Sequence, residues 1–262
     1  MRRGFGTSDG ITIVYEDVGP PDGVPVVLCH GLAAAAAQFA ADAAFFAEQG
    51  YHVLVPNLRG HGDSDPGEDY SIARMALDLV EMFVHAGVRP VHWVGNSLGG
   101  ILALSLLTSE PTMFRTLATF GTSYALGLPR WTPWFIPIGY RVLGRDITAT
   151  LTAWMTTADR ESRTIIADIL HEFDPDVGRA VAASLVRYDF IAQAAEATLP
   201  ILMLRCGQDR AVNAALGPTL KAMRKRPNFR LVEVPRGGHC ANLDASEEVR
   251  AELMRFWDDT GG

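Results

Sequence analysis

A single serine set between glycines is the feature that most constrains how this chain folds. Residues 91–94 are apolar except for His92, Gly95 and Gly99 stand two positions either side of Ser97, and a second apolar run starts at Ile101. A Gly-x-Ser-x-Gly pattern between a strand and a helix forms a turn so tight that the serine backbone is strained. Glycines at those positions remove side chains that would collide with the neighbouring strand and helix. The pattern predicts a strand, a sharp turn and a helix, with the Ser97 hydroxyl above the carboxyl end of a sheet.

Short apolar segments alternate with amphipathic ones over most of the chain. Apolar runs bounded by turn residues predict strands, and apolar residues at three- and four-residue spacing predict helices. Strands are predicted over residues 11–18, 25–29, 53–56, 91–94, 116–120, 201–206 and 229–234, and helices over residues 38–49, 71–86, 98–108, 216–224 and 246–257. This alternation is typical of the α/β class, with a mostly parallel central sheet flanked by helices.

The segment from Tyr124 to Ala195 breaks this rhythm. It contains no convincing strand pattern, and its helical spacing is clearest over residues 147–156 and 162–173. We expect a mostly helical insertion between two strands of the sheet. The chain would then consist of a first core part over residues 1–123, a helical cap over residues 124–195 and a second core part over residues 196–262.

Charge and composition exclude several classes of partner. Lysine and arginine number 23 and aspartate and glutamate 30, so the formal charge of −7 makes a nucleic-acid partner unexpected. The most apolar stretch, residues 24–47, is interrupted by His30, Gln38 and Asp42, so no membrane span is expected. No apolar signal-peptide segment follows the first residues. The three cysteines lack disulfide or metal-site spacing, so we expect a reduced, cytoplasmic setting.

A serine hydroxyl becomes a good nucleophile only when a base takes its proton, so the expected chemistry requires a histidine that can reach Ser97. His239 follows the last predicted strand, and a loop there opens at the same edge of the sheet as the Ser97 turn. The chain order Ser, Asp, His also favours His239 as the base. His61, in an Arg-Gly-His-Gly loop, is a weaker rival, and His30 is expected to brace its own loop.

The base in turn needs an acid that orients the imidazole and stabilises its charged form. Asp209 directly follows the strand predicted over residues 201–206, and its loop opens at the carboxyl edge of the sheet. The competing loop after Phe120 contains no acid, so Asp209 is favoured partly by elimination. Asp244 is interpreted instead as the N-cap of the last helix, in a capping box with Glu247.

Acyl-transfer chemistry also needs N–H donors aimed at a developing oxyanion. The backbone N–H of Leu98, directly after Ser97, is the first candidate. The second is the N–H of Leu32, because His30-Gly31-Leu32 follows an early buried strand and Gly31 allows close approach of the backbone.

Five motifs occur in one order across nearly the whole chain: His30-Gly31-Leu32, residues 57–64 (NLRGHGDS), Gly95 to Gly100, Gly207-Gln208-Asp209 and Gly237-Gly238-His239. In these motifs the chain resembles the α/β-hydrolase superfamily, in its esterase, lipase and C–C hydrolase branch. The resemblance implies Ser97 as nucleophile, Asp209 as acid, His239 as base and a helical cap over residues 124–195. It also implies an oxyanion hole built from the amides of Leu32 and Leu98.

Two departures from the family pattern lie near the expected site. Asn57 stands where members often have aspartate, and the alanine run of residues 33–37 lacks side chains that often line the first loop. A serine at the turn also argues against relatives that attack with a carboxylate, such as haloalkane dehalogenases and epoxide hydrolases, and indicates acyl transfer to water.

The expected activity is hydrolysis of a carboxylic ester, or a related acyl bond such as a lactone, in a small and largely apolar substrate through an acyl-enzyme. This reaction needs no metal or organic cofactor. Trp131, Trp134 and Trp154 are candidates for an apolar substrate pocket, although packing of the cap onto the core is the better explanation for any one of them.

Other functions stay open at this point. A C–C bond hydrolase of ring-cleavage products is one, because Gly-Asn-Ser-x-Gly-Gly resembles the turn of that group, although residues 240–243 lack the tryptophan expected beside its histidine. A non-catalytic small-molecule receptor and an acyltransferase are the others.

Overall fold

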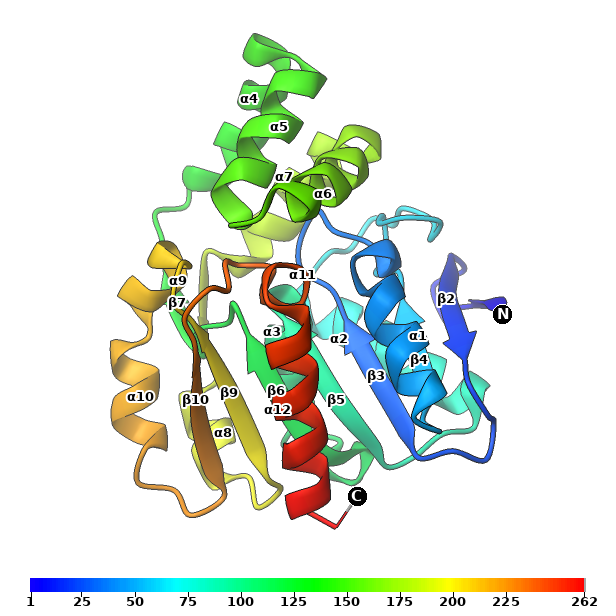
Figure 1. Cartoon of the computed structure of the whole chain (residues 1–262). Helices are drawn as coiled ribbons and strands as arrows, with labels where there is room; N and C mark the ends of the chain where they lie inside the picture. The colour runs from blue at the N-terminus through cyan, green and yellow to red at the C-terminus, as the bar shows by residue number, and fades with distance from the viewer. Residues whose placement is uncertain (262) are drawn as a thin grey trace.

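The computed structural model describes residues 1–261 and has an eight-stranded sheet as its centre (Figure 1). The strand order is β1-β2-β4-β3-β5-β6-β9-β10. The strands are β1 (Arg2–Gly6), β2 (Thr12–Val18), β3 (Pro25–Cys29), β4 (His52–Pro56), β5 (Val91–Asn96), β6 (Phe114–Phe120), β9 (Ile201–Cys206) and β10 (Phe229–Val234). From β4 to β10 all neighbours are parallel, whereas β1 and β2 pair antiparallel at one edge. The predicted α/β class with a mostly parallel sheet is confirmed.

Helices cover both faces of this sheet. One face packs against α1 (Ala40–Glu48) and α12 (Ser246–Asp259), and the other against α2 (Ile72–Ala86), α3 (Leu98–Leu106), α8 (Ile191–Glu196) and α10 (Gly217–Met223). The central strands β3, β4 and β5 are almost wholly buried and apolar, as parallel strands covered on both faces must be. Helix α2 begins where the Ser71 hydroxyl accepts the Arg74 N–H and ends at Gly87, whose φ is 70°.

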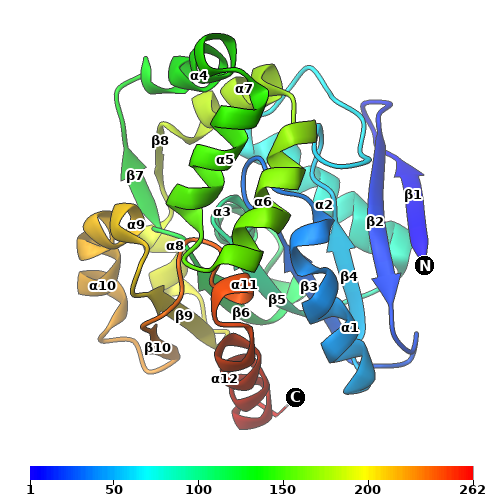
Figure 2. The ribbon, with the colours of Figure 1, turned by 45° about the horizontal axis from the view of Figure 1, so that its top comes forward.

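A layer of four helices lies above the carboxyl edge of the sheet (Figures 1 and 2). It comprises α4 (Phe135–Leu143), α5 (Arg145–Thr156), α6 (Arg160–Glu172) and α7 (Pro175–Leu185), and is called the helical layer below. The expectation that residues 124–195 contain no strand is wrong in detail. Strands β7 (Ala125–Gly127) and β8 (Arg187–Asp189) pair antiparallel at the two ends of the segment. Each is only three residues long, too short to produce a visible alternation.

Two short helices and a 3₁₀ turn lie in the connections that follow β9, β10 and β3. Helix α9 (Arg210–Ala215) follows β9, and α11 (Ala241–Asp244) lies between the loop after β10 and α12. A 3₁₀ turn over Ala36–Phe39 precedes α1. Within residues 1–261, none of the helices is both long and apolar enough to cross a bilayer.

Candidate active site

Ser97 lies at the turn between β5 and α3, in the strained conformation that its flanking glycines predict. Its φ is 50° and its ψ is −112°, an unfavourable region for a residue with a side chain. A Cβ at Gly99 would collide with the carbonyl oxygen of Cys29 on β3, and one at Gly95 would collide with the backbone of Gly100. Both glycines are therefore required for β5 and α3 to approach each other this closely.

Asp209 and His239 meet above the ends of two adjacent parallel strands. Asp209 follows β9 and His239 follows β10, and the His239 Nδ1 lies 2.7 Å from the Asp209 Oδ2. The carboxylate side chain is 5% exposed and the imidazole 25%. Because an ionised carboxylate can only accept, Nδ1 carries the proton and Nε2 is left as an acceptor. Asp209 also caps α9 by accepting the Val212 N–H at 3.1 Å.

The loop that carries His239 is attached to the residue before Ser97. The side-chain amide of Asn96 donates to the backbone carbonyl of His239 at 2.8 Å. Gly121, directly after β6, lies against the same carbonyl, since a Cβ there would be 2.9 Å from the His239 carbonyl oxygen and 3.1 Å from its Nδ1. In the described part of the chain no hydrogen bond joins the Ser97 hydroxyl to the His239 ring. Direct contact between these two side chains therefore stays a prediction.

The loop formed by residues 30–35 lies beside Ser97. A Cβ at Gly31 would be 3.2 Å from the Ser97 Cβ. Over residues 1–261, the backbone N–H groups of Leu32 and Leu98 have no hydrogen-bond acceptor. Both amides are thus available near the serine, Leu98 at the N-terminus of α3, where negative charge is favoured.

Two buried histidines brace this loop. The Nε2 of His30 accepts the Leu58 N–H at 3.1 Å, and the Nε2 of His61 accepts the Ala33 N–H at 3.2 Å. Each Nδ1 lies within 2.9 Å of a backbone carbonyl. Burial lowers the pKa of His30 to about 3 and that of His61 to about 4. Both nitrogens of His61 are occupied, which argues against it as the base, and His30 braces its loop as predicted.

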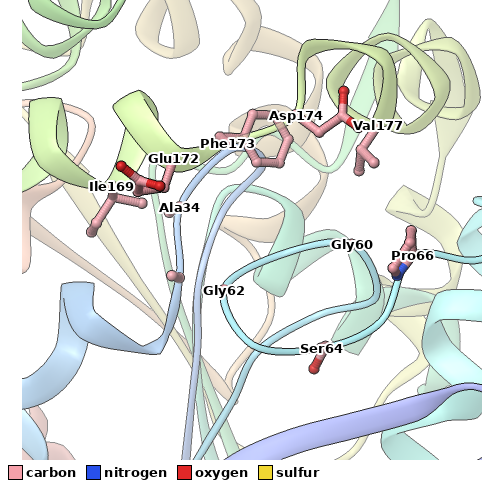
Figure 3. A pocket seen from close by; sticks show the side chains of 11 residues that line it. Ala34, Gly60, Gly62, Ser64, Pro66, Ile169, Glu172, Phe173, Asp174 and Val177 are labelled. Atoms are coloured by element: carbon pink, nitrogen blue, oxygen red, sulfur yellow. The ribbon is translucent and has the colours of Figure 1, made fainter.

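The side chain of Asn57 is hydrogen-bonded to the backbone of the alanine run. Its Oδ1 accepts the Ala36 N–H at 2.8 Å, a bond that an acceptor of this length makes whether it is an amide or a carboxylate. Ala34 and Ala35, with their small side chains, line one side of a cavity of about 320 Å³. Phe173, between α6 and α7, and Val177 on α7 face the loop with Gly60 and Gly62 across this cavity (Figure 3).

The three predicted pocket tryptophans lie on the surface of the helical layer and the turn before it. Trp131, Trp134 and Trp154 are 59%, 56% and 64% exposed. Trp131 contacts the ring of Phe135, and Arg179 lies over Trp134 with its guanidinium 4.7 Å from the ring centroid. The structure does not bring these side chains together with Ser97, and their contact with substrate stays a prediction.

The predicted capping role of Asp244 is wrong. Ala245 is the N-cap of α12, and no side chain caps it. The Asp244 carboxylate instead accepts the Gly238 N–H at 2.8 Å and the Asp159 N–H at 3.1 Å. It therefore ties the loop of His239 to the turn between α5 and α6. The turn of α11 displaces Asp244 from the position that a capping box requires.

Two buried amides near the site had no signal in the sequence. Gln38 and Asn242 are 204 positions apart, yet the Gln38 Nε2 donates to the Asn242 Oδ1 at 3.0 Å. Neither lies in a recognisable motif, and only the folded chain brings them together. As for metals, no three His, Cys, Asp or Glu side chains within residues 1–261 are grouped to hold an ion.

Comparison with known proteins gives one family match over most of the chain. The model of a family described as "Alpha/beta hydrolase family" matches residues 26–252. Among curated proteins, one named putative carbamate hydrolase RutD from Stutzerimonas stutzeri (strain A1501) is 26% identical over 248 residues, which is 89% of this chain and 91% of that protein. A non-heme chloroperoxidase from Streptomyces lividans is 38% identical over 95 residues, but the match covers 36% of this chain and 34% of that protein. For the first relatives matched, the chain aligns with only 30–40% of their length.

Solved structures resemble the whole chain. An esterase from Exiguobacterium antarcticum has a TM-score of 0.86 at 20% identity and covers 98% of this chain and 99% of its own. The enol-lactonase from Burkholderia xenovorans LB400 has a TM-score of 0.84 at 19% identity and covers 95% and 97%. At these identities the likeness establishes a shared fold and no shared substrate.

Proposed function

The chain belongs to the alpha/beta hydrolase family, and from that membership and the site geometry we propose that it is a serine hydrolase acting on a carboxylic ester or lactone of a small, largely apolar substrate. Ser97 is the proposed nucleophile, His239 the base and Asp209 the acid. Residues 124–195 are the proposed cap over this site, with residues 1–123 and 196–262 as the core. No cofactor enters the proposed reaction.

One observation carries the proposal. The bond of 2.7 Å between His239 and Asp209 stands at the same edge of the sheet as a serine held at a φ of 50°. Asp209 fixes the tautomer in which Nε2 is free to take the Ser97 proton. The strained turn presents the hydroxyl, and its strain is understandable if that presentation serves the reaction.

In the proposed reaction the Ser97 oxygen attacks the substrate carbonyl while His239 takes its proton. The N–H groups of Leu32 and Leu98 stabilise the oxyanion. His239 then protonates the leaving alkoxide, and an acyl-enzyme remains on Ser97. A water molecule activated by His239 attacks the acyl-enzyme, the acid leaves, and the proton returns to Ser97.

The named relatives indicate which acyl bonds to test. Structures that share the fold include an esterase and an enol-lactonase, and the curated relative that aligns over most of the chain is named a putative carbamate hydrolase. We therefore propose a panel of short-chain p-nitrophenyl esters, lactones and carbamates, with a coloured dienol ketone acid to test C–C bond hydrolysis.

The deciding comparison is between the wild type and Ser97→Ala. We expect ester turnover in the wild type and a loss of at least about 10³-fold in kcat for Ser97→Ala, because the nucleophile is gone. Ser105→Ala is the matched control, since Ser105 lies on the helix that begins at Leu98 and its hydroxyl donates to the Leu102 carbonyl. Turnover that survives in Ser97→Ala contradicts the proposal. Bleaching of the dienol acid alone indicates a C–C hydrolase, and tight binding without turnover indicates a receptor.

A further inference from the structure

Three buried side-chain amides form a hydrogen-bonded network next to Ser97. Asn96, Gln38 and Asn242 are 1%, 1% and 2% exposed. The Gln38 Nε2 donates at 3.0 Å to the side-chain oxygens of both Asn96 and Asn242. The Asn96 amide then donates to the His239 carbonyl at 2.8 Å and, more weakly, to the Phe120 carbonyl at 3.3 Å. Buried polar groups are costly unless they are bonded, so a network at this place requires a reason.

A carboxylate at the Asn242 end of this network determines which group donates in each of its hydrogen bonds. Asp42 accepts the Asn242 Nδ2 at 2.8 Å and the Arg250 Nε at 2.6 Å. Because a carboxylate can only accept, Asn242 must turn its NH₂ to Asp42 and its oxygen to Gln38. Gln38 must then donate to both neighbours, and Asn96 must turn its NH₂ to His239.

Each amide belongs to a different segment of the candidate site. Gln38 lies in the 3₁₀ turn that follows the loop of Leu32, Asn96 directly precedes Ser97, and Asn242 lies in α11, three residues after His239. The Gln38 backbone carbonyl also accepts the Asn242 amide at 3.0 Å, so the first and last segments are joined twice. The orientation of Gln38 leaves its own Oε1 without a partner within residues 1–261.

We propose that Asn96 is a positioning residue for His239, and that Gln38 and Asn242 orient Asn96 for this task. The proposal rests on the proposed function of Ser97 and His239. The Asn96 bond fixes the backbone from which the imidazole extends, at the residue adjacent to the nucleophile. A displacement of about 1 Å in a reacting group can lower a rate by about 100-fold.

The test compares Asn96→Asp with a matched control, Asn228→Asp. Asn228 also donates to two backbone carbonyls, those of Ala197 and Leu199 at 2.9 and 2.7 Å, but it lies before β10 at the opposite edge of the sheet. In Asn96→Asp an ionised carboxylate cannot donate to the His239 carbonyl, and a protonated one has a single proton for the carbonyls of both His239 and Phe120. We expect kcat to fall about 10- to 100-fold with KM within about twofold, whereas Asn228→Asp keeps the wild-type kcat.

A spectroscopic measurement separates positioning from loss of stability and does not depend on turnover. We expect the proton that His239 Nδ1 donates to Asp209 to give a low-field NMR resonance. We expect this resonance to shift or broaden in Asn96→Asp and to stay unchanged in Asn228→Asp. If the wild type lacks esterase activity, the proposed function fails, and this resonance still tests the positioning role.

Gln38→Met serves if Asn96→Asp does not fold. It removes both amide donors while keeping a long, unbranched side chain, so Asn96 loses the partner that orients it. We expect kcat to fall and the resonance to shift as in Asn96→Asp, but each by a smaller amount. Folded variants at both positions that keep wild-type kcat and an unchanged resonance would overturn the proposal.

Discussion

At the scale of single residues, His61 connects the stability of this protein to pH. Burial lowers its pKa to about 4 from the ordinary value of 6.5. Between these values the unfolded chain binds a proton that the folded chain does not, so folding becomes less favourable as pH falls through this range. The stabilisation is fully present above about pH 6.5 and is lost on approach to pH 4. In the folded state the neutral ring is needed to accept the Ala33 N–H.

His61→Gln should reduce this dependence on pH. Its side-chain oxygen can still accept the Ala33 N–H, but it does not titrate. Between about pH 7 and pH 5 we expect the free energy of unfolding of the wild type to fall by ~2 kcal/mol more than that of the variant. Urea unfolding at the two pH values measures this difference. Equal losses in both proteins would show that His61 is not responsible.

At the scale of elements, the turn between β5 and α3 leaves no room for a side chain at Gly99. A Cβ there would collide with backbone of β3, which cannot move without disturbing the centre of the sheet. We expect Gly99→Ala to lower the free energy of unfolding by about 3 kcal/mol or to prevent folding. Urea unfolding and the yield of folded protein measure the effect.

Gly139 provides a control of opposite sign. It lies inside α4, and a Cβ there would meet only Thr148, at an ordinary 3.7 Å. Gly139→Ala should therefore stabilise the chain by about 0.5–1 kcal/mol through helix propensity. A loss of stability at Gly139 that equals the loss at Gly99 would contradict the steric explanation.

How well an element can be predicted depends on how much of its cause is local. Helix α2 was predictable because its cap and its glycine stop lie within its own sequence. Strand β1 was missed because only Phe5 of its five residues is buried, and its pairing with β2 is invisible in the sequence. Asp209 and His239 could be placed together because adjacent parallel strands end at one edge. Gln38 and Asn242 could not, because no local pattern joins positions this far apart.

At the scale of the whole molecule, helices α4 and α5 of the helical layer bury much less of their surface than the strands of the sheet do. In the described chain α4 contributes no buried side chain, and α5 contributes only Ala149 and Ala153. The small cluster that buries Ala149 and Ala153 also includes Cys240, next to His239. Of the 14 exposed large apolar side chains in the part of the chain described, 11 lie within residues 128–155. Burial, which stabilises β5 and its neighbours, is therefore largely missing here.

Hydrogen exchange should reveal this difference in local stability. We expect amides of residues 135–156 to exchange through local opening well before those of β5, which open only on global unfolding. Exchange followed by mass spectrometry resolves the two regions. Equal protection in both would mean that the layer and the sheet unfold as one cooperative unit.

The uneven placement of the five tryptophans has an optical consequence. Trp93 and Trp257 are 0% exposed in the core, whereas the other three lie on or beside the helical layer with more than half of each side chain in water. Tryptophan emission in this protein therefore comes from a buried group and an exposed group, and a water-soluble quencher such as acrylamide reaches only the exposed group. The exposed tryptophans therefore serve as a built-in fluorescent probe for movements of the helical layer. The unquenched emission of Trp93 and Trp257 is the internal reference.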